Sequence, residues 1–149
     1  ALSFHEMGAS LMAGRAQFSF DGINDQLTHC AAPPLFYSHL DRMISGSKRT
    51  GALLTLASIS IPIVSTLDEI LSMAHVINQK MRREDLCGRL GHFQFVLVVS
   101  GSLSDGEKLV ERIAKSSDFE FTSELVQWNP GETSLEILYR LDREGELTI

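Results

Sequence analysis

The stretch MRREDLCGRLGHFQFVLVV (Met81–Val99) carries the pattern that decides the fold. Four charged residues precede a short apolar arm, a glycine marks a turn, and a longer apolar and aromatic arm follows. We predict a β-hairpin, with Leu86–Leu90 as its first arm, Gly91 and His92 near the turn, and Phe93–Val99 as its second arm. The elements on either side are predicted outward from this hairpin.

A helix and a central strand are predicted ahead of the hairpin. Proline suits the first turn of a helix, so Pro33-Pro34 favours a helix start. We expect that helix to end at Gly46 and the SKRTG segment (47–51). The run ALLTLASISIPI (Ala52–Ile63) is apolar on both of its faces, as in a strand covered by helices on both sides.

Three further helix starts are marked by capping boxes, in which a Ser or Thr side chain and an acid three residues later bind each other's backbone N–H. The pairs are Thr66 with Glu69, Ser104 with Glu107, and Thr133 with Glu136. We expect the first of these helices to end near Arg82. The alternating segment Phe119–Trp128, between the second and third helices, is predicted to be a strand.

The predicted order over residues 33–149 is helix, strand, helix, hairpin, helix, strand, helix. Alternating strands and helices indicate an α/β domain with a central mixed β-sheet flanked by helices. Residues 1–32 are predicted to be a linker or N-terminal extension, and AQFSFDGIND (16–25) within them offers a strand and turn.

Composition and charge restrict the classes of partner. The chain has 149 residues, 44% hydrophobic and 21% charged, values typical of a globular domain. A net charge of −6 offers no basic field for nucleic acid, although a local arginine cluster can still bind a compact anion. The longest apolar run (59–64) is too short to cross a bilayer, and we expect a cytoplasmic protein or the cytoplasmic part of a larger one.

Cysteine and histidine usage gives no sign of a metal site. Cys30 and Cys87 lie 57 positions apart with no CxxC spacing, so we expect two reduced thiols. The five histidines have no metal-ligand spacing.

The segment RREDLCGRLGHFQFVLVVSGSLSDGEKLVERI (82–113), within this order of elements, resembles the GGDEF domain family of bacterial diguanylate cyclases. The resemblance covers residues 33–149 and implies the nucleotidyl-cyclase-like fold. In active members the hairpin tip reads Gly-Gly-Asp/Glu-Glu-Phe. The five matching residues here are Gly91, His92, Phe93, Gln94 and Phe95. Only the first glycine and the last phenylalanine agree, so this hairpin carries a degenerate motif.

The resemblance also implies which catalytic groups are missing. In the family, acids at the hairpin and on the central strand hold divalent cations against the GTP triphosphate. Phe93 and Gln94 replace the hairpin acids, and Ser58 and Ser60 replace those of the strand. Neutral side chains cannot balance the charge of metal-assisted phosphoryl transfer. We therefore expect no cyclase activity, no metal ion and no cofactor.

One family motif is retained. Active cyclases often carry an inhibitory product site, Arg-x-x-Asp, five residues before the hairpin motif, and Arg82 and Asp85 stand at that spacing before Gly91. A further arginine from the following helix joins the site in the family, and Arg112 occupies the corresponding place. Arginine forks bind phosphates or the guanine edge, and aspartate accepts hydrogen bonds from guanine N1 and N2.

We therefore predict a non-catalytic cyclic di-GMP receptor that binds through Arg82, Asp85 and Arg112. The alternative is a ligand-independent degenerate GGDEF module used for dimerisation or protein docking. A third hypothesis, a domain that senses GTP without cyclising it, is weakened by His92 in place of the second glycine. Other domains of the same chain or a protein partner would receive the signal. In a ligand-linked homodimer, Arg42 or Arg49 could complete the site of a ligand held between two copies.

Overall fold

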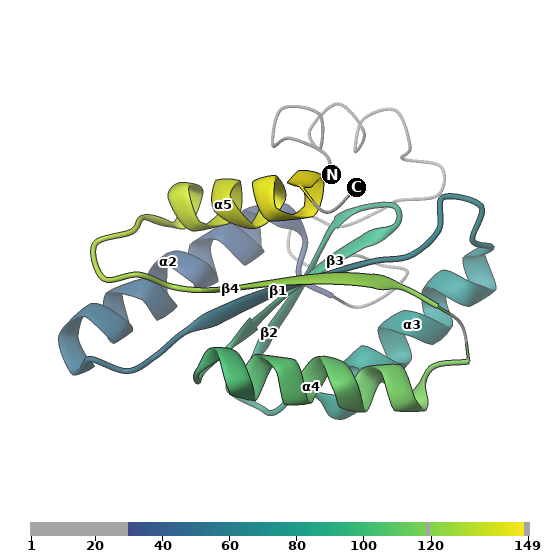
Figure 1. Cartoon of the computed structure of the whole chain (residues 1–149), viewed down its shortest axis with the longest axis horizontal. Helices are drawn as coiled ribbons and strands as arrows, with labels where there is room; N and C mark the ends of the chain where they lie inside the picture. The colour runs from purple at the N-terminus through teal and green to yellow at the C-terminus, as the bar shows by residue number, and fades with distance from the viewer. Residues whose placement is uncertain (1–29, 119, 148–149) are drawn as a thin grey trace.

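The computed structural model describes residues 30–118 and 120–147, with side chains described up to residue 142. Its elements, labelled in Figure 1, follow the predicted order of helices and strands. They are α2 (Pro33–Thr50), β1 (Thr55–Ser60), α3 (Leu67–Lys80), β2 (Leu86–Gly91), β3 (Gln94–Val99), α4 (Leu103–Ser116), β4 (Thr122–Gln127) and α5 (Ser134–Leu147).

The four strands form one sheet in the order β2-β3-β1-β4, and every neighbouring pair is antiparallel. The expected mixing of parallel and antiparallel strands is therefore wrong for these four strands. The reason is that each helical crossover skips a strand: β3 lies between β1 and β2, and β1 lies between β3 and β4. Parallel pairing in the described residues is confined to an isolated bridge between Ala31 and Gly88.

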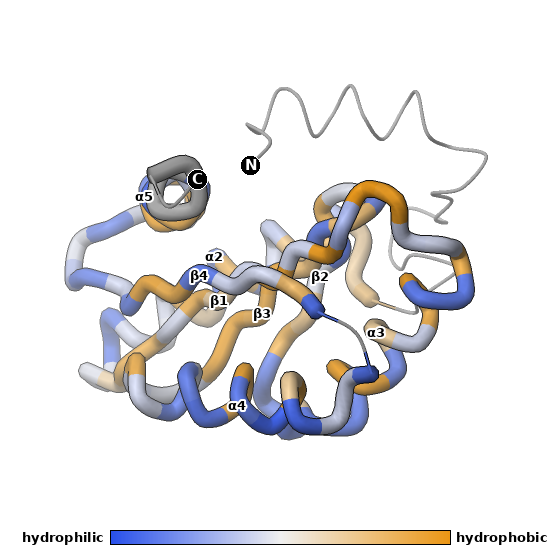
Figure 2. The backbone as a smooth tube through the Cα atoms, turned by 45° about the vertical axis from the view of Figure 1, so that its right-hand side comes forward, coloured by the Kyte–Doolittle hydropathy of each residue, from blue (hydrophilic) through white to orange (hydrophobic). Residues whose placement is uncertain are grey.

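Helices cover both faces of the sheet, as the apolar run of β1 predicted. The pair α2 and α5 packs on one face, where Leu56 and Val98 contribute to a core with Phe36. The pair α3 and α4 packs on the other face, where Ile59 and Leu97 are buried. Figure 2 shows hydrophobic stretches along β1 and β3 and many hydrophilic residues along α4, whose buried positions are Gly106, Leu109, Val110 and Ile113.

Side-chain caps fix where the helices begin. The predicted boxes of Thr66 with Glu69 and of Thr133 with Glu136 are confirmed, because each pair exchanges hydrogen bonds with the other's backbone N–H. The box predicted at Ser104 and Glu107 is wrong.

Helix α4 begins two residues earlier than predicted. Its capping box consists of Ser102 and Asp105, and the Gln127 side chain accepts a hydrogen bond from the Leu103 N–H (2.8 Å). The sequence contains two overlapping Ser-x-x-acid patterns, and the contact from β4 favours the first of them.

The hairpin turn lies one residue later than predicted. Gly91 pairs with Gln94 at the end of the ladder, so His92 and Phe93 form the turn. The register shifts between Arg89 and Gly91, which gives β2 one extra residue. The Phe93 carbonyl accepts a hydrogen bond from the Ile61 N–H (2.9 Å), so the turn is tied to the end of β1.

Glycine is needed at two positions, 51 and 88, for different structural reasons. Gly51 ends α2 with φ +76°, a left-handed conformation that glycine adopts without strain, so the helix continues past Gly46. Gly88 on β2 instead provides space, because a Cβ there would lie 2.4 Å from Cδ1 of the buried Phe36. This close approach seats α2 on the sheet.

Helix α5 is fastened to β4 by a charged contact. The Arg140 guanidinium donates to both carboxylate oxygens of Glu132 (2.9 Å each) and to the Gln127 carbonyl (2.6 Å). The hydrogen bond from Arg140 is the main cause that lowers the pKa of Glu132. The Glu132 side chain is only 12% exposed, so solvent screens this pair weakly.

We expect the Glu132→Gln variant to lose about 1.5–3 kcal/mol of unfolding free energy at neutral pH, since it removes a charge-assisted hydrogen bond. A carboxyl whose pKa is lowered on folding stabilises the fold above its unfolded pKa. That stability is lost as pH falls through the lower folded pKa. The unfolding free energy measured with urea should therefore fall more steeply below about pH 4.5 in the wild type than in the Glu132→Gln variant.

The matched control is Glu111→Gln. Glu111 pairs with Lys115 at 3.1 Å, but both side chains are well exposed, and removing such a pair changes stability by less than about 0.5 kcal/mol. Equal losses in the two variants at neutral pH would contradict a specific role for the Glu132–Arg140 pair.

Among the described residues, no helix is both long and apolar enough to cross a membrane. The strand predicted within 16–25 and most of the predicted 1–32 extension lie outside the described residues. The division at residue 33 therefore stays a prediction.

Candidate functional site

Arg82 and Asp85 face each other across a tight turn between α3 and β2. The Asp85 N–H donates to the Arg82 carbonyl (3.1 Å), and the Arg82 N–H donates to Asp85 Oδ2 (3.1 Å). Asp85 Oδ1 accepts a further hydrogen bond from the Ser100 N–H (3.2 Å), just past the end of β3. The carboxylate is thus held in place by backbone donors from two segments, and the Arg82 side chain is exposed.

Arg112 reaches the same corner of the molecule from α4. Its Nη2 donates to the Lys80 carbonyl at 3.5 Å, which brings this guanidinium to the last residue of α3. Like Arg82, it is exposed. The structure therefore gathers the three predicted ligand-binding residues near the end of α3, although Arg112 lies 27 positions beyond Asp85 in the sequence.

A second carboxylate near this corner was missed at the sequence level. The pKa of Asp105 is lowered mainly by hydrogen bonds from the backbone N–H and the hydroxyl of Ser102, and to a smaller extent by the charges of Lys108 and Arg82. Placing the capping box at Ser102 instead of Ser104 in the sequence would have indicated this acid.

The hairpin tip presents aromatic and amide side chains. His92, Phe93 and Gln94 are partly buried, whereas Gly91 and Phe95 are buried. The His92 and Phe93 rings meet edge to face with their centroids 5.9 Å apart. Behind them the fully buried Arg89 donates from Nη2 to the His92 carbonyl (3.0 Å), so a cation supports the backbone of the turn.

The strand positions beside the tip are also neutral. Ser60 pairs with Gln94 on β3 and with Thr122 on β4, and Ser58 is buried opposite Val96. The residues named on β1 and β3 offer hydroxyl and amide oxygens but no carboxylate to a divalent cation, and the acid that pairs with Ser58 is Glu124 on β4. Within residues 30–118 and 120–142, no three His, Cys, Asp or Glu side chains gather in an arrangement that could hold a metal ion.

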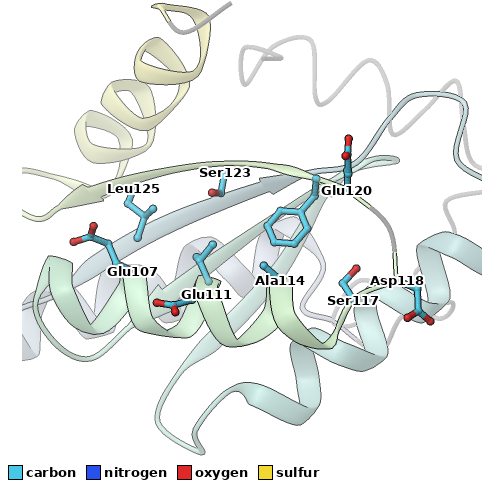
Figure 3. Close-up of a pocket in the computed structure, with 10 residues that line it drawn as sticks. Glu107, Glu111, Ala114, Ser117, Asp118, Glu120, Ser123 and Leu125 are labelled. Atoms are coloured by element: carbon cyan, nitrogen blue, oxygen red, sulfur yellow. The ribbon is translucent and has the colours of Figure 1, made fainter.

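The largest of the described cavities is separate from the Arg82 corner. This groove of about 750 Å³ lies between α4 and β4 (Figure 3). Its apolar lining includes Val110, Phe121 and Leu125, and four acids also line it: Glu107, Glu111, Asp118 and Glu120. An acidic lining repels a polyanion, so the groove is poorly suited to a nucleotide. The Arg82 and Arg112 side chains are exposed instead, and Asp85 is half-buried.

Arg42 and Arg49 do not join the site within one molecule. Both are exposed on α2, on the face of the sheet opposite α3 and α4, and Arg42 donates to the Ser38 hydroxyl (3.3 Å). A role in a ligand held between two copies stays a prediction.

Comparison with solved structures identifies the fold. The GGDEF domain of DgcB from Caulobacter crescentus, in complex with c-di-GMP, superimposes with a TM-score of 0.76 at 19% identity over 83% of this chain and 85% of that one. This chain therefore has the GGDEF fold. A microbial GGDEF domain in a structure with bis-(3′,5′)-cyclic di-GMP gives a TM-score of 0.74 at 13% identity, covering 81% of this chain and 86% of the other.

The diguanylate cyclase SiaD from Pseudomonas aeruginosa, in complex with its activator SiaC, shares the GGDEF fold too. It gives a TM-score of 0.72 at 21% identity, covering 95% of this chain and 62% of SiaD. No protein-family model matches the sequence, and no curated protein matches it significantly. At these identities the comparisons show the GGDEF fold, and activity and ligand must be argued from the residues.

Proposed function

We propose that this chain is a non-catalytic cyclic di-GMP receptor whose ligand binds at Arg82, Asp85 and Arg112. The observation that carries the proposal is the meeting of these residues at the end of α3. The Arg82 and Arg112 side chains are exposed at this end of α3, and backbone donors already orient the Asp85 carboxylate. A dinucleotide with two phosphates and two guanines needs this combination of donors and acceptor.

Asp85 retains capacity for a guanine. A carboxylate has about four lone-pair sites, and the hydrogen bonds from Arg82 and Ser100 use one on each oxygen. The guanine N1–H and N2–H can therefore be accepted without breaking the turn. Preorganisation of this kind lowers the entropic cost of binding. The DgcB domain, which has the same fold, has been crystallised with c-di-GMP.

The non-catalytic part of the proposal rests on the hairpin and β1. Phe93 and Gln94 stand at the tip, and Ser58 and Ser60 stand on the neighbouring strand. None of the four supplies the anionic oxygen that would hold Mg²⁺ against a triphosphate. We therefore infer that a degenerate hairpin motif lies beside a retained Arg-x-x-Asp site.

A second candidate function is protein docking without a ligand, and an exposed apolar loop favours it. Ile63 and Val64, between β1 and α3, are 81% and 84% exposed, and Leu67 follows at 48%. The Ile61–Phe93 backbone hydrogen bond places the start of this loop beside the hairpin tip. Adjacent exposed apolar side chains of this size are typical of protein contacts.

Isothermal titration of cyclic di-GMP into the folded chain tests the proposal. We expect a Kd on the order of 1 μM, which corresponds to about 8 kcal/mol of binding free energy. Arg112→Ala should weaken binding about tenfold, the effect of losing one solvent-exposed charge-assisted contact. Lys115→Ala, which removes an exposed cation from the same helix, is the matched control and should bind as the wild type does.

Absence of heat from a folded sample would overturn the receptor proposal and favour the docking module. Heat with GTP and Mg²⁺ but none with cyclic di-GMP would favour a GTP sensor. Incubation with GTP and Mg²⁺ should yield neither pyrophosphate nor a cyclic product, and detection of either would contradict the non-catalytic assignment.

A further inference from the structure

Two cysteines that are distant in the sequence lie against each other in the fold. The Sγ atoms of Cys30 and Cys87 are 3.4 Å apart although 57 positions separate the residues. Cys30 precedes α2, and Cys87 is the second residue of β2. They are the only cysteines of the chain, and no disulfide joins them.

Backbone pairing holds the two thiols in register. The Ala31 N–H donates to the Cys87 carbonyl (3.0 Å), and the Arg89 N–H donates to the Ala31 carbonyl (3.2 Å). These two hydrogen bonds make the parallel bridge between Ala31 and Gly88 at the β2 edge of the sheet. The thiol contact is therefore built into the strand pairing.

The surroundings of the pair are apolar. Cys30 and Cys87 are 2% and 5% exposed and belong to the core beneath α3 and α4, with Ile77 and Phe95 among its members. The hydrogen bond with Cys30, together with burial, raises the pKa of the Cys87 thiol. Burial excludes bulky thiol reagents, and the raised pKa keeps the thiolate fraction small, so we expect oxidation by a small oxidant to be slow at neutral pH and faster as the pH rises.

We propose that Cys30 and Cys87 form an oxidation site that hydrogen peroxide closes to an intramolecular disulfide. The thiolate of one cysteine attacks a peroxide oxygen, the O–O bond breaks, and hydroxide leaves to become water. The resulting sulfenic acid is attacked by the second cysteine; the S–S bond forms as the S–O bond breaks, and a second water leaves. Two thiols and one peroxide thus give one disulfide and two waters.

The geometry requires only a small adjustment. A disulfide has an S–S bond of about 2.05 Å, so the sulfurs must approach by about 1.4 Å from their contact at 3.4 Å. The bond would join the segment that enters α2 to β2, immediately after Asp85. It would convert a one-residue bridge into a covalent attachment and close a loop of 57 residues that stays open in the reduced chain.

The experiment treats the reduced 149-residue chain with a small excess of hydrogen peroxide. We expect the intact mass to fall by two hydrogens, the protein to remain monomeric on a non-reducing gel, and digestion to release a linked peptide pair containing Cys30 and Cys87. The melting temperature should rise by on the order of 10 °C, because a loop of this length is closed, and dithiothreitol should reverse the rise.

Two variants provide the controls. Cys30→Ala and Cys87→Ala each leave one thiol and should show neither the mass loss nor the rise in melting temperature. A chain oxidised while unfolded in urea shows which products two unaligned thiols give. Disulfide-linked dimers as the main product of the folded chain, separate sulfinic acids at the two cysteines, or a share of intramolecular disulfide no higher than in urea would each overturn the proposal.

Discussion

Replacing Arg82 by alanine is expected to weaken cyclic di-GMP binding by about 100-fold, close to 3 kcal/mol. A bidentate contact between arginine and guanine or phosphate contributes about 1–3 kcal/mol, and an arginine beside an oriented carboxylate belongs at the upper end of that range. The measurement is isothermal titration of the variant alongside the wild type.

The Arg82→Ala variant is informative because it should leave the turn intact. The hydrogen bond between Arg82 and Asp85 uses the Arg82 backbone N–H, which alanine keeps. A change at Asp85 would be harder to interpret, because that side chain also binds the Ser100 N–H and its loss would disturb the site's architecture. Loss of binding without loss of stability is therefore the result specific to Arg82.

Arg83→Ala is the matched control, since Arg83 is exposed, adjacent and equally charged. It should bind cyclic di-GMP with nearly the affinity of the wild type. If both variants lose affinity equally, binding depends on general charge near the end of α3. If Arg82→Ala binds as tightly as the wild type, the site lies elsewhere.

Gly88→Ala is expected to cost about 3 kcal/mol of unfolding free energy. The new Cβ would lie 2.4 Å from Cδ1 and 2.8 Å from Cγ of Phe36, whose side chain is fully buried. Either the ring or α2 must move, and overpacking of this kind costs about 1–3 kcal/mol. Urea unfolding measures the change.

Gly46→Ala is the control and should act in the opposite direction. Gly46 lies inside α2. The atom nearest to a Cβ added there is Nη2 at the flexible end of the Arg49 side chain, 3.9 Å away. Alanine there should stabilise the chain by about 0.5–1 kcal/mol through helix propensity. A second variant that adds Phe36→Leu to Gly88→Ala should recover part of the loss. Gly88→Ala with wild-type stability would contradict the packing of α2 against β2.

The sequence predicted those elements whose signals are local. The hairpin followed from a glycine turn between two apolar arms, and the Thr66 and Thr133 boxes carried enough information in four residues. The start of α4 was missed because two local patterns compete, and only the distant Gln127 side chain distinguishes them. The strand order was missed because skipping a strand depends on how crossovers pack, which no single segment encodes.

The candidate site likewise combines residues that the sequence predicted with contacts that only the structure shows. Arg82 and Asp85 were predicted together because a fixed spacing separates them from the hairpin. The approach of Arg112 to Lys80 depends on the packing of α3 against α4, and only the structure places it. The contact between Cys30 and Cys87 had no sequence signal at all, because a strand bridge aligns residues that local patterns cannot relate.

The acids on and just before β4 have a consequence for the tendency of the protein to aggregate. Within the described part of the chain, β4 is an edge strand, and exposed edges template unwanted sheet growth between molecules. Two copies meeting edge to edge would bring together Glu124 of each β4 strand and Glu120, which lies just before each strand, in a chain whose net charge is already −6. We expect this repulsion to disfavour edge-to-edge association through β4.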